Sequence, residues 1–298
     1  MHKLFRGLGV ALVTPFKAGA VDFDALSVLI EHCIEGGVDF LVSLGTTGET
    51  ATLSTDEQLK VLDFTVAKVA GRVKIVAGFA GNNTAALLTA IKTYHFKGVD
   101  AILSASPAYN KPSQEGIFQH FMAIEACCPV PIIIYNVPGR TASNITAETT
   151  LRLANASSKF VAIKEASGDI AQCMQLVKGK KPANFAILSG DDNLTLAMLS
   201  LGMDGLISVV ANAFPAAYSD LVQCGLDGRF DQARKLHYQY MDLVDLLFVE
   251  GNPAGIKIVL EQMQLCQAGL RLPLVSVSQA TQERIQTSVS ALLKTLAV

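Results

Sequence analysis

The stretch Phe160-Val161-Ala162-Ile163-Lys164-Glu165-Ala166 places one pair of charged residues in an otherwise apolar run. Such a run is typical of a strand in a parallel sheet that is covered on both faces. Burial disfavours the charged form of an amine, and a neutral lysine amine is a nucleophile that forms a Schiff base with a carbonyl compound. The alternative is a structural lysine at the end of a strand, with its ammonium in solvent or beside a carboxylate such as Glu165.

Seven further runs along the chain share the apolar character of this stretch. They cover Gly7–Thr14, Phe40–Gly45, Val73–Gly78, Ala101–Ser106, Pro131–Asn136, Ala186–Gly190 and Gly205–Val210. Segments with helical patterns lie between them, at Asp22–Glu35, Thr55–Ala70, Thr84–Phe96, Gln114–Ala126, Ala147–Ala154, Ile170–Val177 and Leu194–Leu201. This alternation predicts an α/β fold of the (β/α)8 type, a TIM barrel. An open, doubly wound sheet is the alternative, but the glycine-rich phosphate turn that usually follows its first strand is missing.

The end of the chain has a different pattern. From Phe214 onward it lacks a strong strand signal and predicts helices, at Phe230–Phe248, Asn252–Gln267 and Ser278–Leu296 among others. We therefore expect residues 1–213 to form the catalytic barrel core. Residues 214–298 should form a C-terminal helical extension that includes the last barrel helix and packs on the barrel.

Composition excludes several classes of function. Half of the 298 residues are hydrophobic, 17% are charged and the formal net charge is −2, without a run of basic residues. Nucleic acid and membrane surfaces are therefore not expected partners, and no apolar stretch reaches membrane-spanning length. The six cysteines form no CxxC pair and the five histidines no metal-binding spacing, so we expect free thiols and no metal. The N-terminal apolar run is too short for a signal peptide and fits the first strand, which predicts a cytoplasmic protein.

Polar groups follow several of the predicted strands, where the active sites of such barrels lie. The loop Gly45-Thr46-Thr47-Gly48-Glu49 offers two hydroxyls and backbone N–H groups, and Tyr109 follows the fourth strand. Tyr135 ends the fifth strand, and Arg140 in the next loop has the geometry to bind a carboxylate. Each of these residues alone has an ordinary structural explanation. Together with Lys164 they favour an aldolase that forms a Schiff base with a keto acid.

Five segments resemble the dihydrodipicolinate synthase / N-acetylneuraminate lyase family of pyruvate-dependent class I aldolases, in family order and spacing over essentially the whole chain. They are Gly45-Thr46-Thr47-Gly48-Glu49, Tyr109-Asn110-Lys111-Pro112, Tyr135-Asn136-Val137-Pro138-Gly139-Arg140-Thr141, Ile163-Lys164-Glu165-Ala166-Ser167-Gly168-Asp169 and Gly205-Leu206-Ile207-Ser208-Val209. The threonine pair and the segment around Arg140 look like the synthase branch of the family. That branch condenses pyruvate with L-aspartate 4-semialdehyde to give 4-hydroxy-tetrahydrodipicolinate, in the diaminopimelate route to lysine.

The resemblance implies catalytic roles for four residues. Lys164 forms the imine with pyruvate, and Tyr135 moves protons with the help of Thr46. The family residue that matches Tyr109 enters from a neighbouring subunit and completes the relay, which implies a homo-oligomer, usually a dimer of dimers. No metal and no organic cofactor is implied, because the imine itself accepts the electrons.

The resemblance also implies four substrate-binding residues. Thr47 binds the pyruvate carboxylate, Arg140 binds the carboxylate of the semialdehyde, and Gly190 and Ile207 complete the set. Two alternatives stay open from the sequence. One is an aldolase for another aldehyde, such as a sialic acid or a keto-deoxy sugar acid, and the other is a barrel that has lost catalysis and only binds.

Overall fold

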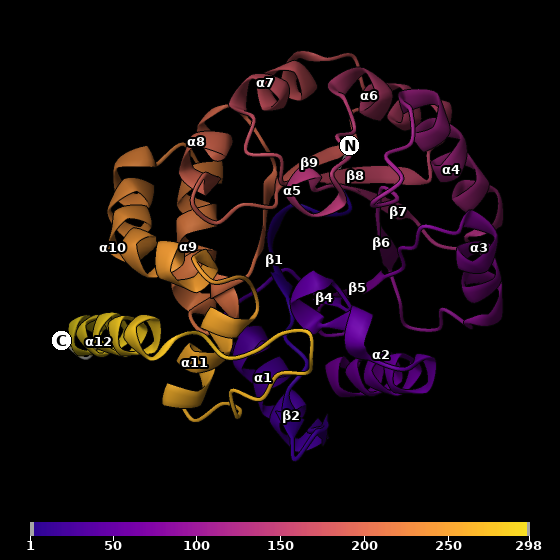
Figure 1. The fold of residues 1–298 in the computed structure, drawn as a ribbon. Helices are drawn as coiled ribbons and strands as arrows, with labels where there is room; N and C mark the ends of the chain where they lie inside the picture. Colours follow the sequence, from indigo (N-terminus) through magenta and orange to yellow (C-terminus); the bar gives the residue numbers. More distant parts are fainter. Residues whose placement is uncertain (1–2, 297–298) are drawn as a thin grey trace.

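The computed structural model describes residues 3–296, and its centre is a closed barrel of eight parallel strands (Figure 1). The order around the barrel is β1-β10-β9-β8-β7-β6-β5-β4. The strands are β1 (Gly7–Ala11), β4 (Phe40–Ser43), β5 (Lys74–Gly78), β6 (Ala101–Ala105), β7 (Ile132–Asn136), β8 (Phe160–Glu165), β9 (Ala186–Ser189) and β10 (Gly205–Ser208). The predicted (β/α)8 barrel is therefore confirmed. Some strands are shorter than the apolar runs, because residues such as Leu12 and Val13 stay buried after the strand has ended.

Eight helices surround the barrel, one after each strand, as the ring of ribbons in Figure 1 shows. They are α1 (Phe23–Glu35), α2 (Thr55–Val69), α3 (Thr84–Thr93), α4 (Gln114–Cys127), α6 (Ala147–Ala156), α7 (Ile170–Lys178), α8 (Thr195–Ser200) and α9 (Pro215–Leu226). Six of these helices have an N-cap residue whose side chain accepts a hydrogen bond from a backbone N–H of the first turn. Polar residues are preferred at this position for that reason. These residues are Asp22, Ser54, Asn83, Ser113, Thr146 and Asp169.

The C-terminal helices are α10 (Phe230–Phe248), α11 (Ala254–Gln262) and α12 (Gln279–Leu296). α10 packs on α9, and α12 lies against α10 and α11 at the edge of the molecule (Figure 1). α11 is shorter than the expected helix Asn252–Gln267, because the backbone turns to a positive φ at Gln264. The short elements that were not predicted include the hairpin of β2 (Phe16–Lys17) with β3 (Ala20–Val21) and the single turn α5 (Pro138–Thr141). Within residues 3–296, no helix is both long and apolar enough to cross a membrane.

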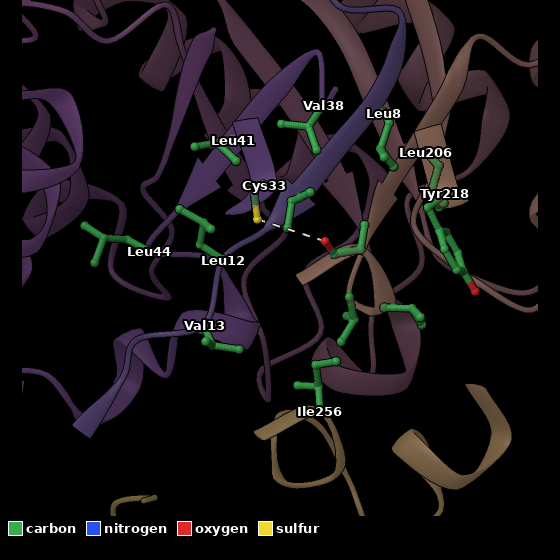
Figure 2. Packing of buried hydrophobic residues seen from close by; sticks show 14 of the residues in the cluster. Leu8, Leu12, Val13, Cys33, Val38, Leu41, Leu44, Leu206, Tyr218 and Ile256 are labelled. Atoms are coloured by element: carbon green, nitrogen blue, oxygen red, sulfur yellow. Dashed lines mark hydrogen bonds between the residues drawn. The ribbon is translucent and has the colours of Figure 1, made fainter. Parts of the chain in front are cut away.

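The apolar side chains form an inner and an outer cluster. Figure 2 shows part of the outer cluster, where Leu8, Leu41 and Leu206 of three strands pack near Cys33 of α1 and Tyr218 of α9. Burial raises the pKa of the Cys33 thiol well above its ordinary range, so this cysteine acts as a core residue.

The amino end of the barrel is closed by aromatic rings. Phe5 meets Phe40 edge to face with 5.2 Å between the ring centroids. Gly9 of β1 lets the Phe40 ring approach, because a β-carbon at Gly9 would lie 2.2 Å from a ring atom of Phe40. The active sites of such barrels lie at the opposite end, where the strands have their carboxyl ends.

Asp192, after β9, joins two strand ends and gives a pH-dependent prediction. Its carboxylate accepts hydrogen bonds from the Ser208 hydroxyl at 2.5 Å and the Val209 N–H at 2.9 Å. Burial raises the pKa of Asp192 from 3.8 to about 6, so the folded protein holds this proton more tightly than the unfolded chain. Raising the pH from about 4 to about 6 should therefore cost the wild type about 2 kcal/mol of unfolding free energy relative to Asp192→Asn. Urea titrations of both proteins across this range measure the difference, and parallel curves would contradict the prediction.

Candidate active site

Lys164 lies near the carboxyl end of β8 and is 6% exposed. The strand register pairs it with Tyr135 of β7 on one side and with Leu188 of β9 on the other. Its Nζ lies 4.5 Å from the centroid of the Tyr135 ring. Among residues 3–296, no carboxylate lies within ion-pair distance of this amine. The structural alternative, a lysine paired with Glu165 or reaching solvent, is therefore not what the structure contains.

Glu165 is fully buried and has a different set of neighbours from Lys164. Its carboxylate accepts hydrogen bonds from the Ser167 N–H at 2.8 Å, the Asn136 amide at 3.0 and 3.1 Å, and the Gln172 amide at 3.0 Å. These neutral donors satisfy the carboxylate without any cation. The two charged residues of the strand thus serve different purposes, and Lys164 keeps its amine free beside Tyr135.

The loop after β4 carries Thr46 and Thr47 in a short 3-10 turn. Thr47 is buried, and its Oγ1 accepts a hydrogen bond of 3.0 Å from the Asn252 side-chain amide. Thr46 is exposed on the rim of the barrel. The Thr14 hydroxyl donates to the Gly48 carbonyl at 2.7 Å and fixes the loop from the side of β1.

A buried ion pair anchors the same loop to the C-terminal helices. Glu49 pairs with Lys257 of α11, and both side chains are fully inaccessible to solvent. The Lys257 amine also donates to the Gly269 carbonyl at 2.7 Å and lies 4.3 Å from the centroid of the Phe16 ring. Burial lowers the pKa of Lys257, while Glu49 opposes this effect. A buried lysine with a carboxylate and a carbonyl as partners is structural, whereas the Lys164 amine has neither within residues 3–296.

Sequence reasoning missed Asn252 and Lys257. The signal for Lys257 was present, because it stands alone in the apolar run Ala254–Leu260 just as Lys164 does in its strand. Asn252 had no comparable signal, since an asparagine before a proline is a common feature of turns.

Gly190 directly follows β9, and Ile207 lies within β10. The Gly190 N–H donates to the Glu165 carbonyl at 2.7 Å, which holds the end of β9 against β8. A β-carbon at Gly190 would lie 2.9 Å from Cε of Lys164 and 2.7 Å from Cβ of Ala166. Ile207 of β10 belongs to the inner cluster that also contains Tyr135.

Tyr109 and Arg140 are exposed in this single chain. Tyr109 is 91% exposed, has a positive φ of 69° and donates its N–H to the Thr141 carbonyl at 3.3 Å. Arg140 lies in α5, the turn that Thr141 ends, so the loops after β6 and β7 are tied together at the rim. The structure thus brings Lys164, Tyr135 and Gly190 into contact and leaves Thr46, Tyr109 and Arg140 on the surface of the rim.

The fold and the site define a (β/α)8 barrel in which a buried lysine amine lies beside a tyrosine. Among residues 3–296, no group of three or more histidine, cysteine, aspartate or glutamate side chains is arranged to hold a metal ion. The sequence model of the dihydrodipicolinate synthetase family matches residues 4–292. The chain belongs to this family.

Individual relatives match over nearly the whole chain. The 4-hydroxy-tetrahydrodipicolinate synthase of Parabacteroides distasonis is 48% identical over 94% of this chain and 95% of its own. The synthase of Koribacter versatilis is 49% identical over 94% of each chain. The solved structure of the synthase from Methylacidiphilum fumariolicum SolV has a TM-score of 0.95 and 41% identity, and covers 98% of this chain and 97% of that chain. The dihydrodipicolinate synthase structure from Thermotoga maritima has a TM-score of 0.94 and 37% identity, with coverage of 97% and 99%.

The contact between Gly190 and Lys164 gives a prediction. In Gly190→Ala the new methyl group would displace Cε of Lys164, since the backbone of β9 is fixed by its bond to Glu165. A misplaced nucleophile is expected to lower kcat by about a hundredfold or more. The close approach to Cβ of Ala166 should also lower the free energy of unfolding by about 1–3 kcal/mol, so thermal unfolding checks that the variant stays folded. The matched control is Gly81→Ala, after β5, where a β-carbon would meet its nearest atom only at 3.9 Å. Wild-type turnover by Gly190→Ala would contradict the assigned contact.

Proposed function

We propose that this chain condenses pyruvate with L-aspartate 4-semialdehyde to give 4-hydroxy-tetrahydrodipicolinate, in the diaminopimelate route to lysine. The observation that carries the proposal is the buried, unpaired amine of Lys164 beside the Tyr135 ring. The relatives that share nearly the whole chain carry the name of this synthase. The enzyme is a lyase of the class I aldolase type, and its proposed location is the cytoplasm, where free thiols such as those of its cysteines persist.

The reaction follows from the chemistry of a lysine amine with a keto acid. Lys164 Nζ attacks the ketone carbon of pyruvate, and loss of one water gives an imine. The imine withdraws electrons from the methyl group, which loses a proton to give an enamine. The enamine carbon attacks the aldehyde of the semialdehyde, and the aldehyde oxygen takes up a proton. The amino group of the semialdehyde then attacks the imine carbon, which closes the ring and releases Lys164.

The proton transfers require a hydroxyl near the amine. Tyr135 is the nearest candidate, because its ring lies against Lys164 and its strand is the neighbour of β8. In the proposal, Thr46 at the rim assists Tyr135, and Tyr109 of a second subunit completes the relay. No metal or organic cofactor enters these steps.

Substrate carboxylates are assigned to two groups of residues. Thr47, with the backbone amides of its loop, binds pyruvate, and Gly190 and Ile207 shape the barrel around it. Arg140 binds the carboxylate of the semialdehyde, for which a guanidinium offers two parallel hydrogen bonds. A sialic acid or keto-deoxy sugar acid is the alternative second substrate, and it would depend on Arg140 less.

Self-association accounts for the exposure of Tyr109. A tyrosine that is 91% exposed in a strained backbone conformation gains nothing from its own subunit except the bond to Thr141. Covering by a second copy would bury the ring and deliver its hydroxyl to the other subunit's site. We propose a homo-oligomer, with a dimer of dimers as its form.

Trapping with borohydride tests the Schiff base. Reduction in the presence of pyruvate should attach one reduced pyruvate to Lys164 and abolish turnover. Lys257 is the internal control, since it is buried in an ion pair and should stay unmodified. Mass spectrometry of the digested protein identifies the lysine, and a pyruvate and semialdehyde assay then measures the activity. An unmodified Lys164 would exclude the proposed mechanism and favour a barrel that only binds.

The role of Arg140 has a separate test. Arg140→Ala should raise KM for the semialdehyde by about 10- to 100-fold, since it removes a charged hydrogen-bond donor from a carboxylate. KM for pyruvate and borohydride trapping should not change. Arg140→Lys should restore only part of the loss, because an ammonium lacks the two-pronged geometry. Unchanged kinetics with the semialdehyde would favour the sugar-acid alternative.

Mixed oligomers test the origin of Tyr109. Tyr109→Phe and Lys164→Ala should each be nearly inactive, yet co-refolding equal amounts should restore about a quarter of wild-type activity. The restored site combines Lys164 of one subunit with Tyr109 of the other. If Tyr109 acted within its own subunit, each chain would keep its defect and mixing would restore nothing.

A further inference from the structure

Asn252 lies in the turn between α10 and α11 and reaches the loop that carries Thr47. Its side-chain nitrogen Nδ2 donates to Oγ1 of Thr47 at 3.0 Å. Both side chains are buried, at 7% and 3% exposure. Within residues 3–296, the side-chain oxygen of Asn252 has no hydrogen-bond partner. The bond therefore joins a residue of the C-terminal extension to the residue proposed to bind pyruvate.

This bond fixes the direction of the Thr47 hydroxyl. A threonine hydroxyl has one hydrogen to donate, and its oxygen accepts from other donors. The Asn252 NH2 group can only donate, so the hydrogen of Thr47 must point elsewhere. A carboxylate such as that of pyruvate is an acceptor only and needs this hydrogen.

The unpartnered oxygen of Asn252 supports a functional reason for this arrangement. A buried carbonyl oxygen without a donor carries a free-energy cost. In Asn252 the oxygen stays unpaired while the nitrogen donates to Thr47. Sites where stability is sacrificed in this way are often functional.

The turn that carries Asn252 is held firmly in place. α11 begins directly after it, and Lys257 N–H donates to the Pro253 carbonyl at 3.1 Å. Lys257 in turn pairs with Glu49, two residues after Thr47. The extension therefore contacts the loop after β4 at Thr47 and at Glu49, and Asn252 is fixed relative to Thr47.

We propose that Asn252 is a positioning residue that keeps the Thr47 hydroxyl available as a donor to the pyruvate carboxylate. This inference rests on the proposed function, in which Thr47 binds pyruvate. Asn252 acts through Thr47, and its effect is specific to the first substrate.

Two near-isosteric variants separate this role from simple packing. Asn252→Leu removes the bond and should raise KM for pyruvate by about tenfold. Asn252→Asp should raise it by about a hundredfold or more, because the carboxylate accepts the Thr47 hydrogen and also repels the substrate's carboxylate. KM for the semialdehyde should stay within about twofold of wild type in both. If Asn252 only packed against its neighbours, its substitution would change KM for both substrates or for neither. The aspartate variant would then not raise KM for pyruvate more than the leucine variant does.

Matched controls complete the experiment. Gln262 of α11 also has a buried, unpartnered oxygen, but its nitrogen donates to the Gln286 carbonyl and the Ser290 hydroxyl on α12. Gln262→Leu should therefore leave both KM values unchanged. Thermal unfolding of every variant checks folding, and Asn252→Ala replaces the leucine variant if leucine prevents folding.

Thr47→Val distinguishes the proposed role of Thr47 in pyruvate binding from the proposed role of Asn252. If Thr47→Val leaves KM for pyruvate unchanged, the role of Thr47 in the proposed function is wrong. If Thr47→Val raises it, Asn252→Leu should add nothing in that background, because the two residues act through one hydrogen bond. Additive effects, or equal effects of Asn252→Leu and Asn252→Asp, would overturn the role of Asn252 and leave the proposed function intact.

Discussion

The buried ion pair between Glu49 and Lys257 is the interaction on which the site's geometry depends. It joins the loop after β4 to α11, across more than two hundred residues of sequence. Breaking a buried pair by removal of one partner typically costs about 3–5 kcal/mol, because the other charge stays buried alone. The loop that carries Thr47 is thus fixed by a residue outside the barrel strands. The C-terminal extension therefore helps to hold the loop that carries Thr47 in place.

The two buried lysines, Lys257 and Lys164, have different surroundings. The Lys257 amine contacts a carboxylate, a carbonyl and an aromatic ring, so its charge stabilises the fold. Lys164 has the Tyr135 ring beside it, and no carboxylate of the described part of the chain lies within ion-pair distance of its amine. The neighbouring Glu165 is satisfied by amide and backbone donors, which leaves the Lys164 amine without a competing partner.

The sequence predicts what local patterns encode. Eight apolar runs separated by helical segments were enough for the barrel, and the polar residues at the strand ends were enough for Lys164 beside Tyr135. The hairpin of β2 and β3 has only two residues in each strand, too few for a periodic signal. The contact of Asn252 with Thr47 joins residues 205 positions apart, and no pattern along the chain reports such a pairing. The catalytic and substrate-binding roles all stay predictions, for the buried residues Lys164, Tyr135, Thr47 and Ile207, for Gly190, and for Thr46, Tyr109 and Arg140, which are exposed at the rim.

The rim residues share one physical situation. Tyr109 and Arg140 lie on loops after β6 and β7 that are joined by the bond from Tyr109 to Thr141. Any movement that brings a second subunit onto Tyr109 therefore also acts on the turn that carries Arg140. In this arrangement, assembly would complete the proton relay and place the carboxylate-binding arginine in one step. The interior of the barrel, in contrast, is set within one chain by Gly190 and by the packing of Lys164 on Tyr135. In the proposed oligomer, completion of the proton relay and placement of Arg140 would therefore both depend on the assembly.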